Sequence, residues 1–293
     1  MSLEERRVRL STYVVFVDYG TEVEVQHTIR GTRLRVSRAT YEDLLAFQTF
    51  HEPEARHASW LDAGVLVPPF RDVCEYHGGL QPGTEARLGH DYQEWYWRHE
   101  IESEREHRWL GRSVLKMPAD LFFYQELIVA HSLRSVLEVG HGNGGGMWFF
   151  TSILSLLGGG DVFGVDLDGI DGLPGLDSAR GVSMVAVKGD AHDPGTLEAV
   201  RRLRPSGFGL VVIDADPQPT GKLDLLSRWA DLVEPAGIIV VEDVESPACR
   251  AQGGLVEGID LFLLERREFG ILAEAARIPM LKARGAVLKR APG

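Results

Sequence analysis

The feature that most constrains the fold is a regular alternation of short apolar segments and helical segments after Lys116. The apolar segments are SVLEVG, DVFGVDLD, VSMVAVKGD, GLVVIDAD and GIIVVEDVE. Between them the pattern predicts helices over residues 118–131, 146–158, 194–204 and 221–234. Strands that are apolar on both faces and alternate with helices are typical of a parallel sheet covered on both sides. The sequence therefore predicts an α/β fold with a Rossmann-like, mostly parallel, doubly wound sheet.

The first 75 residues have a different pattern. RLSTYVVFVDYG and TEVEVQHTIRGTRLRVS alternate apolar and polar residues, which is typical of half-buried antiparallel strands. Ser37 is a candidate cap for a following helix, and a second short helix and the strand VLVPPF come next. We predict a small α+β, winged-helix-like domain at residues 1–75, a linker and helix at 76–108, and the α/β domain at 109–293.

The charge and the cysteines exclude several classes of partner. The net charge is −12 without a basic block, so neither nucleic acid nor an anionic membrane surface is an expected partner. No segment approaches the roughly 20 apolar residues that span a bilayer, and the N-terminus lacks the apolar run of a signal peptide. Cys74 and Cys249 lie far apart in sequence. We therefore expect a cytoplasmic protein with reduced thiols and a small-molecule ligand.

Each of the five predicted strands ends in acidic residues or glycine. The set consists of Glu138 and Gly140, Asp166 and Asp168, Gly189 and Asp190, Asp214 and Asp216, and Glu242 and Asp243. In an open parallel sheet, ligands bind beyond the carboxyl ends of the strands. Carboxylates gathered at one edge repel one another unless cations or hydroxyl groups meet them. We therefore expect the ligand site at this edge of the sheet.

The loop LEVGHGNGGGMWFF after the first of these strands is compatible with two cofactors. Gly140, Gly142 and Gly145 form G-x-G-x-x-G, which suits the pyrophosphate of a dinucleotide at a helix N-terminus. Glu138 favours S-adenosylmethionine (SAM), because SAM has no phosphate and carries a sulfonium cation and a free amino group. Asp166 suits the ribose hydroxyls of either cofactor. The residues thus favour SAM and leave a nicotinamide dinucleotide as the alternative.

The acids that end the fourth and fifth strands predict a metal site. Asp214, Glu242 and Asp243 would offer oxygen ligands to Mg²⁺ or another divalent cation. A metal there would bind an acceptor oxygen and lower its pKa, with His141, Asp216 or another residue taking the proton. The alternative is that these acids cap helices or stay solvated.

From about Trp109 onward, the chain resembles the cephalosporin hydroxylase family of SAM-dependent methyltransferase-like proteins, to which macrolide-sugar O-methyltransferases are related. The motifs are WLGRSVLKMPADLFFYQELI, LEVGHGNGGG, VFGVDLD, VIDAD and VVEDV, in this order. The resemblance implies a cofactor site of Glu138, Gly140, Gly144, Gly145, Asp166, Asp190, Ala191, His192 and Gln125. In it, Asp190, Ala191 and His192 would lie by the adenine, and Gln125 would line the pocket. The resemblance also implies that Asp214, Glu242 and Asp243 bind Mg²⁺.

Two positions depart from the family pattern. Family members often have a histidine after the fourth strand, at the position that Pro217 occupies here. His141 stands where a small or hydroxyl residue is expected, so it is either a substituted base or a loop residue.

The leading hypothesis is a SAM-dependent, Mg²⁺-assisted O-methyltransferase that acts on a small molecule of natural-product metabolism, such as antibiotic biosynthesis. Asp214, His141 and Asp216 are the candidate catalytic residues. The alternatives are a non-catalytic binding module that retains the methyltransferase fold, and a nicotinamide-dependent oxidoreductase. We also expect a homodimer, with the N-terminal domain serving in dimer formation or substrate capture.

Overall fold

The computed structural model describes residues 6–70, 72, 85–101, 107–170, 181–244, 246, 249, 252–278, 283 and 286–293. Its main sheet has seven strands in the order β10-β9-β8-β11-β12-β14-β13. These strands are β8 (Ser135–Val139), β9 (Gly160–Asp166), β10 (Val182–Lys188), β11 (Phe208–Ile213), β12 (Val233–Val241), β13 (Phe269–Ile271) and β14 (Val287–Arg290). β8 to β12 are parallel and β14 is antiparallel to both of its neighbours. The predicted mostly parallel sheet is confirmed; β13 and β14 were not predicted.

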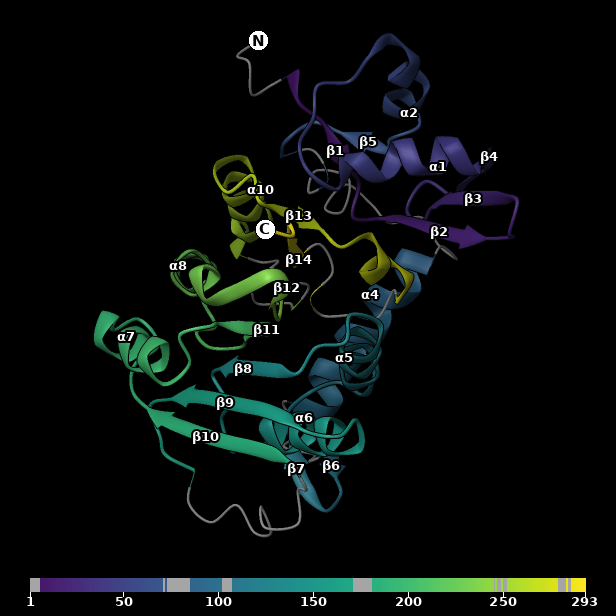
Figure 1. The fold of residues 1–293 in the computed structure, drawn as a ribbon. Coiled ribbons are helices and arrows are strands. Elements are labelled where there is room, and N and C mark those ends of the chain that lie inside the picture. Colours follow the sequence, from purple (N-terminus) through teal and green to yellow (C-terminus); the bar gives the residue numbers. More distant parts are fainter. Residues whose placement is uncertain are drawn as a thin grey trace.

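Helices cover both faces of this sheet (Figure 1). They are α5 (Pro118–Ala130), α6 (Gly145–Leu156), α7 (Pro194–Leu203), α8 (Pro219–Trp229), the 3₁₀ turn η6 (Ala230–Leu232) and α10 (Leu255–Glu265). Neighbouring residues of a strand point to opposite faces. Accordingly, Leu137 packs in the apolar cluster under α7, α8 and α10, whereas Val136 packs in the cluster under α5 and α6. The four predicted helices are present, but the last, predicted over residues 221–234, ends with η6 at Leu232, because Val233 begins β12.

The N-terminal segment forms a separate α+β unit. Its elements are β1 (Arg9–Leu10), β2 (Val14–Asp18), β3 (Glu22–His27), β4 (Thr32–Ser37), α1 (Arg38–Leu45), η2 (Ala46–Gln48), η3 (Ala55–His57), α2 (Ala58–Asp62) and β5 (Leu66–Val67). β2, β3 and β4 form an antiparallel meander, and β1 pairs with β5. Ser37 caps α1, since its Oγ accepts a hydrogen bond from the backbone of Thr40 at 3.2 Å. The winged-helix likeness and the domain boundary at residue 75 stay predictions.

A buried arginine joins this unit to the main sheet. Arg9 is 1% exposed and donates through Nε to Asp260 of α10 at 2.8 Å and through a terminal nitrogen to Asp72 at 2.6 Å. The backbone of Phe70 donates to the second oxygen of Asp260 at 2.8 Å. The N-terminal unit is therefore anchored through charges that are out of contact with water.

A connecting segment runs between the two parts and borders the edge of the sheet where the acids gather. It contains α4 (Glu85–Tyr96), the π-helical turn η4 (Trp97–Ile101) and a hairpin of β6 (His107–Trp109) and β7 (Arg112–Val114). The expected helix is thus present, but residues 107–108 of the segment predicted as linker and helix form a strand. The hydroxyl of Tyr96 donates to the carbonyl of Lys116 at 3.5 Å, which holds the end of α4 beside Lys116.

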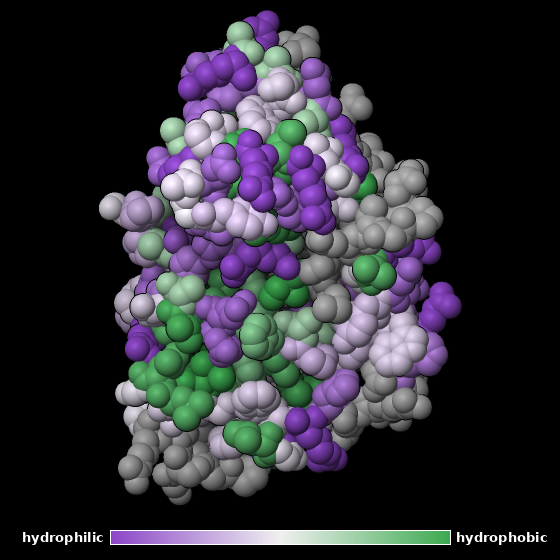
Figure 2. Space-filling model, turned by 90° about the vertical axis from the view of Figure 1, so that its right-hand side faces the viewer, coloured by the Kyte–Doolittle hydropathy of each residue, from purple (hydrophilic) through white to green (hydrophobic). Residues whose placement is uncertain are grey.

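The outer side of α5 is apolar and exposed. Phe122 and Val129 are 59% and 52% exposed. Figure 2 shows hydrophobic side chains gathered in the lower half of the molecule's right-hand side as drawn in Figure 1. In the described part of the chain no helix is long and apolar enough to cross a membrane. Cys249 is buried and unpaired, and Cys74 lies outside the described residues.

Candidate active site

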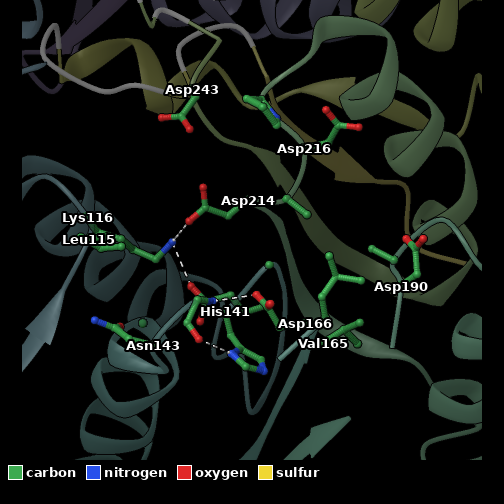
Figure 3. Close-up of a pocket in the computed structure, with 18 of the residues that line it drawn as sticks. Leu115, Lys116, His141, Asn143, Val165, Asp166, Asp190, Asp214, Asp216 and Asp243 are labelled. Atoms are coloured by element: carbon green, nitrogen blue, oxygen red, sulfur yellow. Dashed lines mark hydrogen bonds and ion pairs between the residues drawn. The ribbon is translucent and has the colours of Figure 1, made fainter. Parts of the chain in front are cut away.

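A cavity of about 630 Å³ opens at the carboxyl ends of the parallel strands. It is lined by residues from every predicted strand end and from the connecting segment: Trp97, Leu115, Lys116, Glu138, Gly140–Asn143, Gly146, Val165–Leu167, Gly189–His192, Asp214–Pro217 and Asp243. Figure 3 shows the acids of β11 and β12 in one half of the cavity and the glycine loop below them. The structure thus brings most of the predicted site residues together.

Glycine is required at two positions of this loop because other chain segments approach closely. Gly140 has φ of 93°, and a Cβ there would lie 2.5 Å from the backbone nitrogen of Ala215. A Cβ on Gly146 would lie 2.1 Å from a carboxylate oxygen of Glu138. Both glycines therefore let the loop close against the strand ends.

Two of the glycines that were predicted to contact the cofactor have a packing role instead. Gly144 and Gly145 are not among the described residues that line the cavity. A Cβ on Gly145 would lie 2.0 Å from the carbonyl oxygen of Ser113, so this glycine permits close packing of α6 on β7. Gly144 precedes α6 with φ of 78°. Their contribution is to shape the start of the helix.

Lys116 is the centre of a buried charge cluster. Its ammonium lies 2.9 Å from Glu138, 2.8 Å from Asp214 and 2.7 Å from Glu242. Burial opposes the charge of Lys116, but the three carboxylates together raise its pKa well above the ordinary value. Burial raises the pKa of Glu138, and Lys116 acts in the opposite direction. The second oxygen of Glu138 is buried without a hydrogen-bond partner, and Glu138 lines the cavity.

The predicted metal ligands are only partly assembled. Asp214 and Asp243 line the cavity, and Figure 3 shows both carboxylates on the same side of it. Glu242 is 1% exposed and is turned inward, where it accepts hydrogen bonds from Lys116 and from the hydroxyl of Tyr124 at 2.6 Å. Among the described residues, no group of three or more His, Cys, Asp or Glu side chains is arranged to hold a metal. The ammonium of Lys116 lies between two of the expected ligands.

The predicted ribose and adenine residues lie in the other half of the cavity. Asp166 accepts a hydrogen bond from the backbone of Gly142 at 2.8 Å, so it also fixes the glycine loop. Asp190 is exposed and accepts from the backbone of His192 at 2.8 Å. The carbonyl of Ala191 accepts from the indole of Trp229 at 3.2 Å. The carboxylate of Asp166 and the turn at 190–192 thus border one continuous space.

Two of the candidate proton acceptors, His141 and Asp216, are held in place by their neighbours. The Nδ1 of His141 lies 3.0 Å from the carbonyl of Gly142, and the ring packs against Gly164 with Nε2 buried. Figure 3 shows this ring turned away from Asp214. Asp216 accepts hydrogen bonds on both oxygens, from the backbone of Gln218 at 2.8 Å and from Nε2 of His192 at 3.1 Å.

His192 bridges two carboxylates. Its Nδ1 lies 2.8 Å from Asp224, and its Nε2 faces Asp216. The hydrogen bond with Asp224, followed by that with Asp216, raises the pKa of His192 above its usual value, although burial acts in the opposite direction. The ring therefore links α8 to the loops after β10 and β11.

Sequence reasoning placed Gln125 in the pocket and did not find some of the residues that line the cavity. Gln125 is not among the described residues that line the cavity; its neighbour Tyr124 points inward to Glu242. α5 is apolar on most of its sides, so the helical period did not reveal which side faces the site. Trp97 and Leu115 line the cavity although they precede the sheet. No sequence signal identified them, because their place depends on the path of the connecting segment.

Comparison with known proteins agrees with this architecture. The family model described as rhamnosyl O-methyltransferase/CmcI matches residues 102–250, just over half of the chain. A rhamnosyl O-methyltransferase of Mycobacterium leprae (strain TN) is 25% identical over 159 residues, which is 53% of this chain and 67% of the relative.

Solved structures show the same fold. The match to the structure titled cmcI-D160 Mg-SAM has a TM-score of 0.51 at 21% identity, and it covers 63% of this chain and 76% of the solved chain. The match to the structure titled cmcI-N160 SAH has a TM-score of 0.50 at 19% identity, and it covers 63% of this chain and 82% of the solved chain. The resemblance expected from the motifs is confirmed, and the chain belongs to the rhamnosyl O-methyltransferase/CmcI family, a family of O-methyltransferases with a Rossmann-like α/β fold.

Proposed function

We propose that this chain transfers a methyl group from SAM to a hydroxyl group of a small molecule. The observation that carries the proposal is one cavity with two chemically different halves. Glu138, the glycine loop and Asp166 border one half, and Asp214 and Lys116 border the other. SAM, when bound, supplies a methyl group on a sulfonium cation, and the named relatives with SAM or S-adenosylhomocysteine support this cofactor.

The cofactor half offers acceptors for cationic and hydroxyl groups. The second oxygen of Glu138 is buried and has no hydrogen-bond partner, which is costly unless a donor reaches it. The amino group of SAM is such a donor, whereas a pyrophosphate beside Glu138 would suffer repulsion. Asp166 offers its carboxylate to ribose hydroxyls. These contacts favour SAM over a nicotinamide dinucleotide.

The acceptor half can align a hydroxyl group with the methyl carbon. Alignment supplies much of the rate enhancement in such displacements, because reactants held in place lose no further freedom. Lys116 fixes Asp214 at 2.8 Å and so orients its carboxylate toward the cavity. A rigid carboxylate beside the substrate hydroxyl accepts a hydrogen bond from it and so directs a lone pair of the hydroxyl oxygen toward the methyl carbon.

Magnesium is part of the proposal, with Asp214 and Asp243 as its ligands from this chain. Mg²⁺ in enzymes is commonly held by one or two carboxylates and keeps several waters. The two carboxylates that line the cavity fit this requirement, whereas Glu242 would have to leave Lys116 and Tyr124 to become a third ligand. A divalent cation bound there would hold an acceptor oxygen and lower its pKa. The structure titled cmcI-D160 Mg-SAM supports this cofactor.

A role in natural-product metabolism, a dimeric state and a cytoplasmic location remain predictions. A non-catalytic binding module would have the same fold, so an assay of methyl transfer is needed to distinguish it from the proposed enzyme.

Calorimetric titration tests the cofactor. SAM should bind with one site per chain, and Asp166→Ala should weaken binding at least tenfold, the loss expected for one charged hydrogen-bonding group. Asp168→Ala is the matched control, since Asp168 is exposed and does not line the cavity. Binding of NAD in preference to SAM would refute the proposal.

A further inference from the structure

A second cavity lies at the junction between the N-terminal unit and the main sheet. Its volume is about 280 Å³, and it shares no lining residue with the cavity at the strand ends. The N-terminal unit contributes Arg7 and residues 49–52 to its walls, and α10 and the turn after it contribute Leu263 and Arg267. Each of the two structural units therefore supplies an arginine to one space.

The two arginines come together because the segment around β1 runs along α10 (Figure 1). Alternate residues of an extended chain point to the same side, and Arg9, two residues after Arg7, donates to Asp260 of α10 at 2.8 Å. Arg267 follows Asp260 by seven residues, which is about two helical turns. At Arg9 the facing side chain is thus an acid, whereas the cavity beside Arg7 contains a second arginine.

The walls of this cavity carry an excess of positive charge. Two guanidinium groups stand against one carboxylate, that of Glu52, and a guanidinium stays protonated at any physiological pH. Cations gathered around one space repel one another unless an anion lies between them. The chain as a whole has a net charge of −12, so the sign of this cavity is opposite to that of the protein. An anion is therefore the ligand that complements these walls.

We infer that the cavity binds a phosphate monoester of a small hydroxylated molecule. Guanidinium groups bind phosphate oxygens through pairs of parallel hydrogen bonds. A phosphate monoester carries roughly 1.5 to 2 negative charges at pH 7, which matches two arginines, whereas a carboxylate carries a single charge. The volume lies just below the range of roughly 300–1,000 Å³ that ligand pockets span, so the esterified group must be small.

The remaining walls suit the rest of such a ligand. The hydroxyl of Thr49 and Nε2 of His51 share a hydrogen bond of 2.7 Å, and whichever of them donates, one N–H or O–H of the pair is left to donate to the ligand. Glu52 can accept a hydrogen bond from a ligand hydroxyl. Phe50 is buried with the guanidinium of Arg9 at 5.8 Å from its ring centre, which fixes this side of the cavity. A ligand held here contacts both structural units.

Calorimetric titration of the full chain tests the site with three probes. They are glycerol 3-phosphate, glycerol, which lacks the phosphate, and glycerate, which carries a carboxylate instead. We expect saturable binding of glycerol 3-phosphate at one site per chain, and binding of glycerol and glycerate that is at least tenfold weaker. Absence of saturable binding by glycerol 3-phosphate, or equally tight binding of glycerate, would overturn the inference.

Two substitutions locate the bound phosphate. Arg7→Met and Arg267→Met should each weaken binding of glycerol 3-phosphate about tenfold or more, the loss expected for one charged hydrogen-bonding group. The control Arg202→Met also removes one positive charge, from an exposed residue of α7 outside this cavity, and should leave the affinity unchanged. Circular dichroism checks that each variant is folded. If both cavity variants bound the probe as tightly as the unaltered chain, the phosphate would lie elsewhere and the inference would be wrong.

Thermal unfolding gives a second readout of the same site. A ligand that binds only the folded protein raises its Tm as the site fills. Saturating glycerol 3-phosphate should therefore raise the Tm of the unaltered chain and leave that of the double variant Arg7→Met/Arg267→Met unchanged. An equal increase in both proteins would show that the two arginines do not hold the ligand, and this result would also overturn the inference.

Discussion

Replacing Lys116 by methionine removes the one ammonium that three carboxylates share. The substitution keeps the length and the apolar stem of the side chain and removes its charge. Lys116 is 2% exposed, and its partners Glu138 and Glu242 are each 1% exposed, so these two carboxylates are largely shielded from water in the folded protein. The third partner, Asp214, has a side chain that is 20% exposed and keeps access to solvent. The variant therefore leaves two buried negative charges uncompensated.

The cost follows from these contacts. Removing one partner of a buried ion pair typically destabilises a protein by about 3–5 kcal/mol, because the remaining charge stays buried. A domain of this size loses roughly 2–4 °C of Tm per kcal/mol, so we expect a decrease of about 10 °C. The pKa of folded Lys116 is raised above its unfolded value of about 10.5. Its stabilisation is therefore fully present below pH 10.5 and is lost as the pH rises through the folded pKa.

Thermal and urea unfolding at pH 8 measure this cost. Lys222→Met is a matched control, since Lys222 is 1% exposed but lies 4.0 Å from its nearest carboxylate partner, Asp243. We expect Lys116→Met to cost at least twice as much free energy of unfolding as Lys222→Met. Adding Glu242→Gln to Lys116→Met should restore part of the loss. If both lysine variants unfolded at the same temperature, the cluster would contribute no special stability and the reasoning would be refuted.

Three further predictions concern the loop, the buried carboxylate and the domain junction. Glu138→Gln should weaken SAM binding roughly 10–100-fold, as loss of a charged hydrogen-bond acceptor does. It should not lower Tm, because burial raises the pKa of Glu138 and its charge therefore costs stability as the pH rises through the folded pKa. A decrease in the Tm of this variant at pH 7 would contradict the prediction. Gly146→Ala places a Cβ 2.1 Å from the carboxylate of Glu138 and should weaken SAM binding in calorimetry. Gly169→Ala, outside the cavity lining and with nothing within 4 Å of the added Cβ, should change SAM binding less, and the reverse order would count against the loop geometry. Arg9→Met should lower the free energy of unfolding by about 3–5 kcal/mol, because two buried carboxylates lose their arginine partner. The control Arg38→Met removes an exposed ion pair and should leave Tm unchanged. Equal effects of the two substitutions would exclude an anchoring role for Arg9.

The sheet and its acidic edge could be predicted because both are local properties of the sequence. The five parallel strands are short and largely apolar and carry their acids at or just after their ends, and parallel strands bring their carboxyl ends to one edge. β13 and β14 have three and four residues and lack a clear period, so the pattern did not reveal them. β14 pairs with β12 and β13 pairs with β14, and this pairing is fixed by tertiary contacts.

The direction of individual side chains at that edge could not be predicted. Glu242 and Asp243 are neighbours in sequence, yet Glu242 turns inward and Asp243, with φ of 61°, lines the cavity. Lys116 lies 98 residues from Asp214 and 126 from Glu242 in sequence, so no spacing rule connects them. The assignment of both acids to a metal assumed that each carboxylate faces the ligand, whereas a distant lysine satisfies one of them.

Competition between the two cofactors tests the central claim most directly. The purified protein is mixed with equimolar SAM and NAD, and native mass spectrometry identifies the ligand that remains bound to the intact chain. The cavity with Glu138 and Asp166 predicts a complex with SAM and none with NAD. A complex with NAD, or none with SAM at concentrations that saturate its relatives, would contradict the account.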